Sequence, residues 1–284
     1  MRRICVYHAA CPDGFGAAWA TWTAWGGEGE FVARGHSDRM SGPKVEDALL
    51  LFVDIAPRPD ELRELADYAQ RVVILDHHWT NEKKFEEEAE LLSELQDEGH
   101  EVHFDMDRSG AVLAWRYLFP DQPEPDLLRY VEDQDIWSWT LPKSAEVNAA
   151  IASYPQDFET WTRLAATGMD ELALVGAPIV RTDGIEVDRA IRNPSSIHLG
   201  HRQVEAINAR TRRSAIGHAL AERKAFGQPW GCVYRIEGNR VHATLYSIGD
   251  FDVSAIAGEY GGGGHRNASG FTVHLADWLK EIVN

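Results

Sequence analysis

The first half of the chain alternates between short apolar runs and amphipathic segments. Apolar runs rich in β-branched residues are typical of buried parallel strands, and they cover residues 3–7, 48–53, 71–75 and 102–104. Helical patterns lie between and after these runs, over residues 17–25, 59–70, 85–96, 110–119 and 126–131. Because strands alternate with helices, we predict a doubly wound parallel α/β sheet.

The last part of the chain shows a different pattern. Strand patterns, most of them with alternating apolar and polar residues, cover residues 203–208, 231–236, 240–247 and 270–273. Asp252 can cap a helix over residues 253–259. We therefore predict a smaller mixed α/β domain over residues 200–284, preceded by a first domain over residues 1–180.

Three of the predicted parallel strands end in a residue that can bind a metal. These residues are His8, Asp54 and Asp76, and Asp76 is followed directly by His77 and His78. Ligands of open α/β sheets bind at the carboxyl ends of the strands. Imidazole and carboxylate together suit divalent transition metals. The alternative for each residue alone is structural, such as a helix cap or a core histidine, but their joint position favours a metal site.

The full set of candidate ligands is His8, Asp13, Asp54, His77 and either Asp133 or Asp135. Such a set can hold two divalent ions, between which a water molecule loses its proton near neutral pH and becomes a nucleophile. The same ions would offset the charge of a phosphate. A carboxylate with two oxygens is the natural bridge between them.

A run of glycines is the second candidate site. Gly261, Gly262, Gly263 and Gly264 can bring backbone amides close to a phosphate, and His265 and Arg266 follow directly. The alternative is a flexible loop without a ligand.

Charge and composition limit the partners. The formal net charge of −17 disfavours long nucleic acids, whose binding depends on Lys and Arg neutralising phosphates. No apolar run approaches the ~20 residues of a membrane span. The apolar start is too short for a signal peptide, and three scattered cysteines imply no disulfide framework. We expect a cytoplasmic protein that binds neither membrane nor long duplex nucleic acid.

These motifs together resemble the DHH–DHHA1 phosphoesterases. Asp76-His77-His78 is the naming motif of that family, and the other similar stretches are residues 7–18 (YHAACPDGFGAA), 53–54 (VD), 132–135 (EDQD) and 261–271 (GGGGHRNASGF). The resemblance implies a DHH catalytic domain that binds two divalent ions, usually manganese, and a DHHA1 domain that binds substrate. By this analogy Asp54 would bridge the ions, with His8, Asp13 and His77 as ligands. His78 would face the substrate phosphate, and Asp76 would orient its neighbours.

Two departures from the family pattern stand out. The first motif usually has the form His-x-x-x-Asp-x-Asp, whereas His8 and Asp13 are one residue further apart and Phe15 stands in the place of the second aspartate. Either one metal loses a ligand, or Asp13 takes the other role, that of the missing second aspartate. Many members also carry Leu-Arg-Ser before the glycine run, where this chain has Leu245, Tyr246 and Ser247, so that the phosphate contact is absent or supplied by Arg266.

The function implied by the resemblance is that of a metal-dependent phosphodiesterase acting on short RNA or linear dinucleotides such as pGpG or pApA. The alternatives are a 3′-phosphoadenosine 5′-phosphate phosphatase, a cyclic-dinucleotide hydrolase and a non-catalytic nucleotide-binding module. The oligomeric state is left open, a homodimer included.

Overall fold

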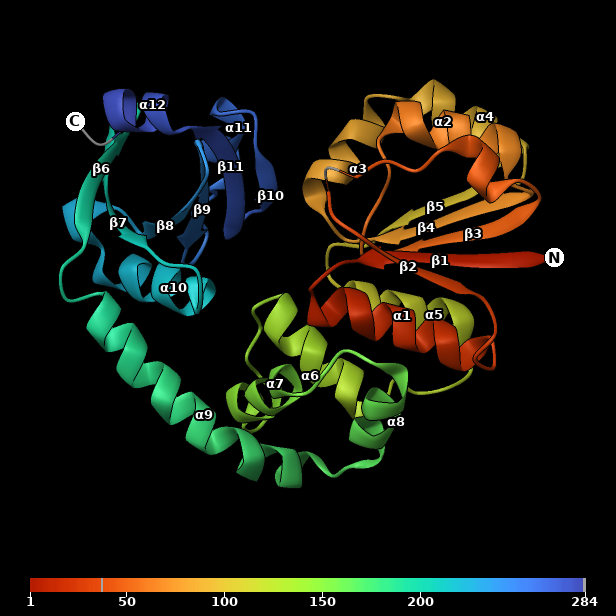
Figure 1. Cartoon of the computed structure of the whole chain (residues 1–284), viewed down its shortest axis with the longest axis horizontal. Coiled ribbons are helices and arrows are strands. Elements are labelled where there is room, and N and C mark those ends of the chain that lie inside the picture. Colours follow the sequence, from red (N-terminus) through yellow and green to blue (C-terminus); the bar gives the residue numbers. More distant parts are fainter. Residues whose placement is uncertain (37, 283–284) are drawn as a thin grey trace. The chain divides into compact units, whose positions relative to one another are not determined.

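The computed structural model describes residues 1–36 and 38–282. The chain divides into two compact units, Met1–Val180 and Arg181–Asn284. Figure 1 shows both units as ribbons coloured along the sequence. The division falls inside one long helix, α9 (Met169–Ala190).

The first unit is built on a five-stranded sheet in which every strand pair is parallel. Its strands are β1 (Arg2–His8), β2 (Glu30–Arg34), β3 (Ala48–Val53), β4 (Arg71–Asp76) and β5 (Glu101–Phe104). The strand order is β2-β1-β3-β4-β5. The predicted fold class is thereby confirmed. The chain changes its winding direction between β1 and β3, and such a switch point is where ligands bind in open α/β sheets.

Helices cover both faces of this sheet (Figure 1). One face carries α1 (Pro12–Ala24) and α5 (Gly110–Leu118), and the other carries α2 (Pro59–Tyr68), α3 (Trp79–Glu86) and α4 (Ala89–Asp97). Neighbouring strand residues separate accordingly: Leu51 and Val53 pack with the first helix pair, whereas Leu50 and Phe52 pack with the second group. A strand buried on both faces needs a continuous apolar run, which is why the sequence predicted β3 and β4.

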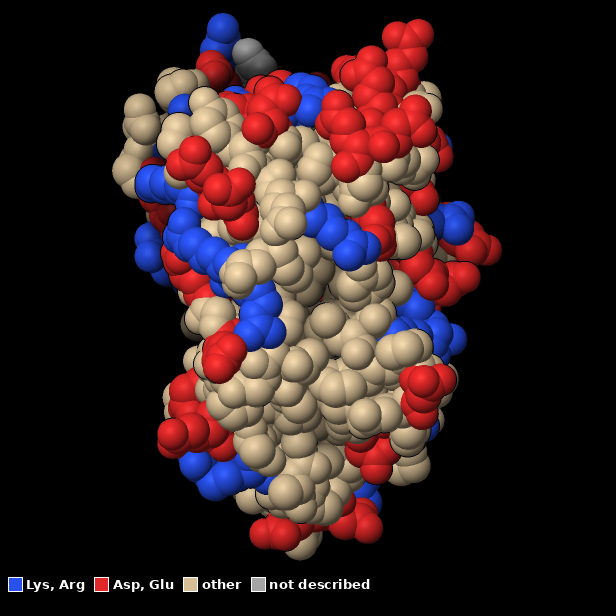
Figure 2. Space-filling model, turned by 90° about the vertical axis from the view of Figure 1, so that its right-hand side faces the viewer, with Lys and Arg blue, Asp and Glu red and all other residues tan. Residues whose placement is uncertain are grey.

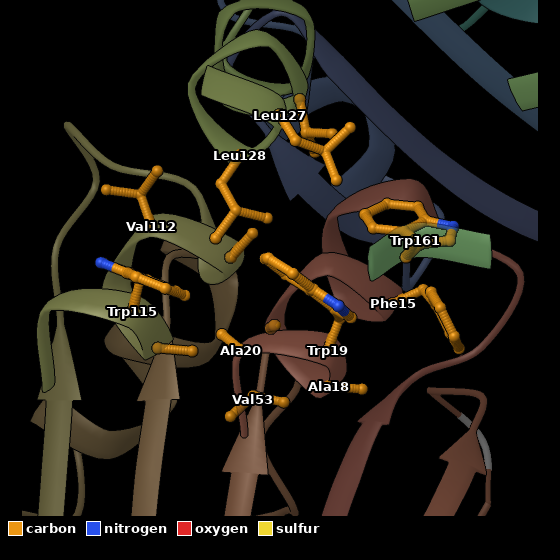
Figure 3. Close-up of a cluster of buried hydrophobic side chains, with 14 of the residues drawn as sticks. Phe15, Ala18, Trp19, Ala20, Val53, Val112, Trp115, Leu127, Leu128 and Trp161 are labelled. Atoms are coloured by element: carbon orange, nitrogen blue, oxygen red, sulfur yellow. The ribbon is translucent and has the colours of Figure 1, made fainter. Parts of the chain in front are cut away.

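Aromatic side chains fill the core between α1 and the helices that follow α5. Those helices are α6 (Asp126–Asp135), α7 (Ser144–Ser153) and α8 (Phe158–Ala166). Phe15 lies in this cluster with Trp19, Trp115 and Trp161 (Figure 3). Phe15 is 3% exposed, and its ring lies 5.1 Å from the ring of Trp161. Phe15 is therefore a core residue of α1.

The second unit contains a six-stranded mixed sheet in the order β10-β11-β9-β8-β7-β6. Its strands are β6 (Ser195–Leu199), β7 (Arg202–Asn208), β8 (Trp230–Glu237), β9 (Arg240–Ser247), β10 (Gly263–His265) and β11 (Ala268–His274). Within this second sheet, β7 and β8 form the only parallel pair among the described strands. One sheet face packs on α10 (Arg213–Arg223) through Ile216 and Leu220. The other packs on α11 (Ser254–Glu259) and on the segments α12 (Leu275–Asp277) and η3 (Trp278–Ile282).

Strands β2, β6 and β10 were not predicted from the sequence. Most residues of β2 are exposed or half-buried, and its apolar run, Phe31 to Ala33, is only three residues long and shows no alternation. The sequence-based assignment therefore placed no strand between α1 and β3, and it did not place His36, which follows β2, near the sheet edge.

The surface carries much of the acidic charge. On the face shown in Figure 2, acidic side chains gather in several clusters, and Lys and Arg lie between them. Among residues 1–36 and 38–282, no helix combines the length and the apolar character that crossing a membrane requires.

Candidate metal centre

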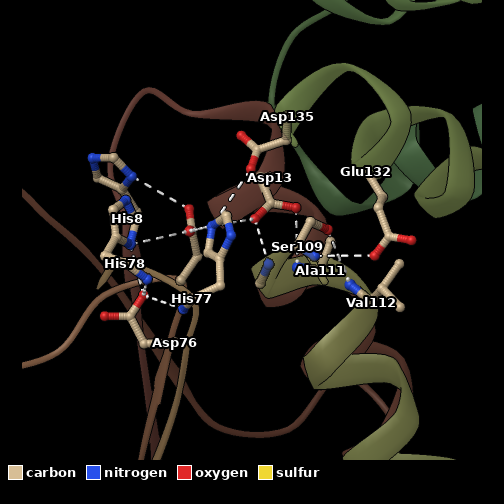
Figure 4. A network of polar contacts seen from close by, with 12 residues as sticks. His8, Asp13, Asp76, His77, His78, Ser109, Ala111, Val112, Glu132 and Asp135 are labelled. Carbon is tan, nitrogen blue, oxygen red and sulfur yellow. Dashed lines mark hydrogen bonds and ion pairs between the residues drawn. The ribbon is translucent and has the colours of Figure 1, made fainter. Parts of the chain in front are cut away.

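Candidate metal ligands gather at the carboxyl ends of β1, β3 and β4, next to the switch point of the first sheet. Tyr7 pairs with Val53, and Val53 pairs with Leu75, so the residues that follow them lie at the same level of the sheet edge. Those residues are His8, Asp54 and Asp76. Figure 4 shows the polar network that they form with the start of α5 and the end of α6.

Asp54 lies at the middle of this network. Its Oδ1 is 3.1 Å from Nε2 of His77, and its Oδ2 is 3.3 Å from Nδ1 of His8. The side chain is 1% exposed, and the backbone adopts a left-handed conformation with φ of 57°. Such a conformation is uncommon for a residue other than glycine and costs ~1–3 kcal/mol, so the surrounding structure must hold it in place.

A first donor group consists of Asp13, His77 and Asp135, whose candidate ligand atoms lie within 4.8 Å of one another. Nε2 of His77 is 3.6 Å from Oδ2 of Asp13 and 3.4 Å from Oδ2 of Asp135. The latter oxygen is buried and has no hydrogen-bond partner among the described residues. A buried carboxylate oxygen without a donor is costly, and a cation at this position would satisfy it.

The start of α5 fixes Asp13. Its Oδ2 accepts a hydrogen bond of 2.6 Å from the Gly110 amide, and its Oδ1 accepts one of 3.1 Å from the Ala111 amide. These amides belong to the first turn of the helix, where the backbone favours negative charge. Gly110 approaches Asp54 so closely that a Cβ at this position would lie 2.4 Å from the Asp54 Cβ.

A second donor group consists of His8, Cys11 and Asp54, again with ligand atoms within 4.8 Å. Asp54 thus contacts both groups, one oxygen toward each histidine. The sequence analysis did not include Cys11, because it considered the three cysteines as possible disulfide partners and not as thiolate ligands. The signal that was available is the spacing of Cys11 and Asp13, which matches the Asp-x-Asp end of the family motif.

A third histidine also lies near this group. The His36 ring is centred 4.5 Å from that of His8 and 5.5 Å from that of His78. It follows β2, whose last residue, Arg34, forms a buried ion pair with Glu61 of α2 at 2.8 Å. The sequence analysis did not include His36 because it did not predict β2.

Asp76 orients its two neighbours. Its Oδ1 lies 2.7 Å from Nδ1 of His78 and accepts a hydrogen bond of 2.8 Å from the His77 amide, while Oδ2 accepts one from Asn81. Burial by itself raises the pKa of the Asp76 carboxyl, but His78 outweighs it and the pKa falls to about 2. Asp76 is thus an acceptor that holds the His78 imidazole and the His77 backbone in position.

The two aspartates at the end of α6 have different surroundings. Oδ1 of Asp133 accepts hydrogen bonds from Ser138 and from the amide and hydroxyl of Thr140, and its Oδ2 accepts one from the Leu141 amide. Asp133 therefore holds the loop after α6 and does not contact the donor groups, which contradicts its candidacy as a ligand. The geometry favours Asp135.

The sequence-based alignment at Phe15 also needs correction. Phe15 points into the core, whereas Asp13 lies against His77 and Asp135, and Cys11 lies against His8 and Asp54. Of the two alternatives left open by the sequence, this geometry favours the one in which Asp13 takes the other role.

The electrostatics of the cluster are those of a cation site. Burial raises the pKa of Asp13 well above its usual range, and Asp135 and Asp54 raise it further. Burial also raises the pKa of Asp54, but hydrogen bonds from His77 and His8 hold it well below its usual range. Burial lowers the pKa of His77, yet the three carboxylates raise it well above the ordinary value. Protons on these groups offset carboxylate repulsion that a divalent cation would offset better.

The thiol of Cys11 responds to the same charges. Burial raises its pKa well above the ordinary value, and Asp54, Asp135 and Asp13 raise it further, while the Gly14 amide lowers it. A thiolate at this position therefore requires a nearby cation.

The glycine run of the second unit is neither the anion-binding loop that the sequence predicted nor the flexible loop that was its alternative. The amides of Gly261 and Gly262 donate to the carbonyls of Gly258 and Ala257 and so end α11. Gly263 and Gly264 belong to β10, an edge strand that pairs with β11. An anion-binding nest formed by all four amides is therefore wrong, because two of the amides already have acceptors.

Two other predicted substrate contacts lie in the interior of the second unit. Ser247 is 1% exposed, and its hydroxyl donates to the carbonyl of Phe251 at 2.7 Å. Tyr246 is 6% exposed and packs against Gly217. Burial contradicts a role of either side chain in binding substrate.

Arg266 and His265 lie at the turn between β10 and β11. Arg266 is exposed, and its guanidinium donates to the backbone carbonyl of Asp250 and forms an ion pair with the Asp250 carboxylate. His265 is half-buried at the end of β10. Both remain predicted substrate contacts.

Comparison with known proteins supports the resemblance. Residues 202–284 match the family model of the DHHA1 domain. The fold of the whole chain, a parallel sheet followed by a mixed sheet, is similar to the folds of several solved structures.

Three solved structures illustrate the similarity. An exopolyphosphatase-related protein from Bacteroides fragilis has a TM-score of 0.55 at 12% identity, covering 95% of this chain and 86% of its own. The pGpG-specific phosphodiesterase PggH from Vibrio cholerae has a TM-score of 0.50 at 12% identity, covering 99% and 96%. RecJ from Thermus thermophilus in complex with Mn²⁺ has a TM-score of 0.50 at 15% identity, covering 98% and 50%. At these identities the similarity concerns the fold.

One curated relative is similar in sequence. The uncharacterized protein R106 of Acanthamoeba polyphaga mimivirus is 27% identical over 289 residues, which cover 94% of this chain. The alignment covers 66% of the relative, so this chain spans somewhat less than two thirds of its length.

Proposed function

We propose that this protein is a metal-dependent phosphodiesterase that hydrolyses short oligonucleotides or linear dinucleotides to mononucleotides. The observation that carries this proposal is the pair of donor groups that share Asp54 at the switch point of the parallel sheet. Two divalent ions, when bound, supply an activated water near neutral pH and offset the charge of the phosphate.

The residues of the chain fit this chemistry. One oxygen of Asp54 is directed to each donor group, as a bridging carboxylate requires. The buried Oδ2 of Asp135 has no hydrogen-bond donor among the described residues, and a cation would take the place of that donor. Asp76 binds Nδ1 of His78, so that a phosphate contact from this ring would be made by Nε2. His77, Asp13 and Asp135 would hold one ion, and His8 with Asp54 would hold the other.

The solved relatives suggest the metal and the substrate. One RecJ structure contains Mn²⁺, and PggH is described as specific for pGpG. We therefore propose Mn²⁺ as the activating ion and a linear dinucleotide as the first substrate to test. The net charge of −17 argues against tight binding of long strands.

The second unit is proposed to contact the substrate through His265, the last residue of the edge strand β10, and Arg266, which follows it. Ser247 and Tyr246 are buried and are no longer candidate contacts. We expect activity to fall steeply between dinucleotides and longer strands, because a surface with a net charge of −17 repels long polyanions.

The test is a substrate panel with Mn²⁺ that contains linear dinucleotides, cyclic dinucleotides, 3′-phosphoadenosine 5′-phosphate, a five-mer and a twenty-mer. We expect the linear dinucleotide to be cleaved fastest. Faster turnover of 3′-phosphoadenosine 5′-phosphate or of the cyclic compounds would replace the proposed substrate with one of the two alternatives. No turnover of any compound, with nucleotide binding retained, would indicate a non-catalytic binding module.

A variant pair ties the activity to the metal centre. Asp54→Asn removes the shared carboxylate charge and should reduce hydrolysis more than ~100-fold, since even residues that only support a ligand contribute 10–100-fold. The exposed Asp97 of α4 offers a matched control, and Asp97→Asn should keep full activity. Near-normal turnover of Asp54→Asn would contradict the dinuclear assignment.

A further inference from the structure

We propose that Cys11 is a thiolate ligand, so that the two metal positions of this centre differ in kind. One position would have imidazole, thiolate and carboxylate donors from His8, Cys11 and Asp54. The other would have one imidazole and carboxylates only, from His77, Asp13, Asp135 and Asp54. This inference rests on the metal centre proposed above and specifies which metals it selects.

The backbone around Cys11 fixes the position of the thiol. Ala10 adopts a left-handed conformation with φ of 55°, and Cys11 itself is extended with φ of −117° and ψ of 131°. The chain turns sharply after β1, and α1 begins at Pro12. Gly14 packs against the His8 backbone so closely that a Cβ would lie 2.4 Å from the His8 carbonyl oxygen. The start of α1 is thus held against the end of β1.

Because of this turn, Cys11 and Asp13 belong to different donor groups although they are only two residues apart. The Cys11 sulfur lies within 4.8 Å of ligand atoms of both His8 and Asp54, whereas Asp13, two residues later, lies with His77 and Asp135. Asp54 completes the arrangement, because its two oxygens face His8 and His77 respectively. The thiol therefore occupies a place equivalent to that of the Asp13 carboxylate in the other group.

An ordinary structural role explains Cys11 less well. Its side chain forms no capping hydrogen bond with α1, although it precedes the first helical residue. Cys5 and Cys232, in contrast, are fully buried among apolar side chains of the two units. Cys11 is only partly buried and lies among polar groups.

The donor chemistry predicts a difference in metal preference. Thiolates select zinc, cobalt and ferrous iron over magnesium and manganese, whereas carboxylate-rich positions accept manganese and magnesium. The His8–Cys11–Asp54 position should therefore prefer zinc or cobalt, and the His77–Asp13–Asp135 position should accept Mn²⁺. A centre loaded with two different metals follows from this arrangement.

Cobalt provides a test that does not depend on activity. We expect Co²⁺ added to the metal-free full-length chain to produce a thiolate-to-cobalt charge-transfer absorption in the near ultraviolet, equivalent to one thiolate per chain. Cys11→Ser should abolish this absorption, while calorimetry should still detect binding of cobalt at the His77 position. Cys232→Ala is the matched control, since it removes a thiol of the other unit and should leave the absorption unchanged.

Metal competition gives a second measurement. The preference of wild-type protein for Zn²⁺ over Mn²⁺ at the tighter position should fall at least ~10-fold in Cys11→Asp, which offers a carboxylate in place of the thiolate. This variant also covers the case in which Cys11→Ser fails to fold.

The outcomes separate the two proposals. Two cobalt ions bound per chain without a charge-transfer band, or a band that survives in Cys11→Ser, would overturn the role of Cys11 and leave the dinuclear phosphodiesterase intact. Failure of wild-type protein to bind any divalent cation would overturn both. A band that is present in wild type and in Cys232→Ala and absent in Cys11→Ser would establish the thiolate ligand.

Discussion

The close approach of α5 to Asp54 makes Gly110 the most informative position for substitution. A Cβ at residue 110 would lie 2.4 Å from the Asp54 Cβ, 2.8 Å from its Cα and 2.9 Å from Oδ2 of Asp13. Contacts this short with a backbone atom cannot be relieved by a side-chain rotation. Gly110→Ala must therefore push the first turn of α5 away from β3, and the amides that hold Asp13 move with it.

The size of the effect follows from two opposing terms. Replacing glycine by alanine in a helix favours folding by ~0.5–1 kcal/mol when the new methyl group meets no neighbour. Overpacking a buried contact costs ~1–3 kcal/mol. Gly184 of α9 has no atom within 4 Å of its ideal Cβ position and so reports the first term alone. We expect Gly184→Ala to be neutral or stabilising and Gly110→Ala to be destabilising by up to ~2.5 kcal/mol, the overpacking cost less the backbone gain.

Thermal unfolding and metal titration of the two variants test this reasoning. The unfolding temperature should change by ~2–4 °C for each kcal/mol in a unit of this size, and Gly110→Ala should lower it. The affinity for Mn²⁺ should fall by ~10–100-fold in Gly110→Ala, as for the loss of a group that supports ligands. If Gly110→Ala matched wild type in both stability and metal affinity, α5 would not hold the site as described.

The remaining predictions concern protons, a buried ion pair and chelation. Metal affinity should rise as the pH is raised through neutrality, because raised pKa values keep protons on His77 and Asp13 that a cation must displace; calorimetry in buffers of different ionisation enthalpy should detect the released protons. Glu61→Gln should destabilise the first unit by ~3–5 kcal/mol because it leaves Arg34 buried without a counter-charge, whereas Glu98→Gln at an exposed pair should cost less than ~1 kcal/mol in the same urea titration. Chelation of metal should lower the unfolding temperature of wild-type protein and have little effect on Asp54→Asn.

The sequence predicted the strand ends because parallel strands place their carboxyl ends at one edge of a sheet. His8, Asp54 and Asp76 each follow an apolar run whose register is set by burial on both faces. Asp13 and Asp135 were within the candidate set as well, but only the structure shows which residues they contact. Choosing between Asp133 and Asp135 depended on which carboxylate the loop after α6 binds, and hydrophobic periodicity carries no such information.

Cys11 and His36 show where sequence reasoning stopped. The position of the Cys11 thiol depends on the left-handed conformation of Ala10, which an alanine does not signal. His36 follows β2, a strand with mostly exposed or half-buried residues and therefore without a recognisable pattern. Both residues approach the site through turns, and turn geometry depends on tertiary contacts more than on local composition.

The glycine run illustrates a different error. Its resemblance to an anion-binding loop was sound as a motif, but it gave no information on whether the amides already had acceptors. The structure explains two of the glycines by packing instead: a Cβ at residue 262 would lie 2.1 Å from the Gly270 carbonyl oxygen, and one at residue 264 would lie 2.7 Å from that of Ala268. Glycine at these positions lets β10 lie against β11, and this requirement exists with or without a phosphate.

The metal centre carries features that are unfavourable without a cation. Asp54 has a strained backbone, Asp135 has a buried oxygen without a hydrogen bond, and the pKa values of Asp13 and Asp135 are raised by burial and by neighbouring charge. A site that accumulates such costs gains more from ligand binding than one that is already satisfied, because the cation removes several of them at once. Binding to the folded state alone then stabilises the fold by mass action, by ~2.7 kcal/mol when the free ion is 100-fold above its dissociation constant. The residues proposed to bind the metal should therefore make the stability of the first unit depend on it, and this dependence can be measured before any substrate is known.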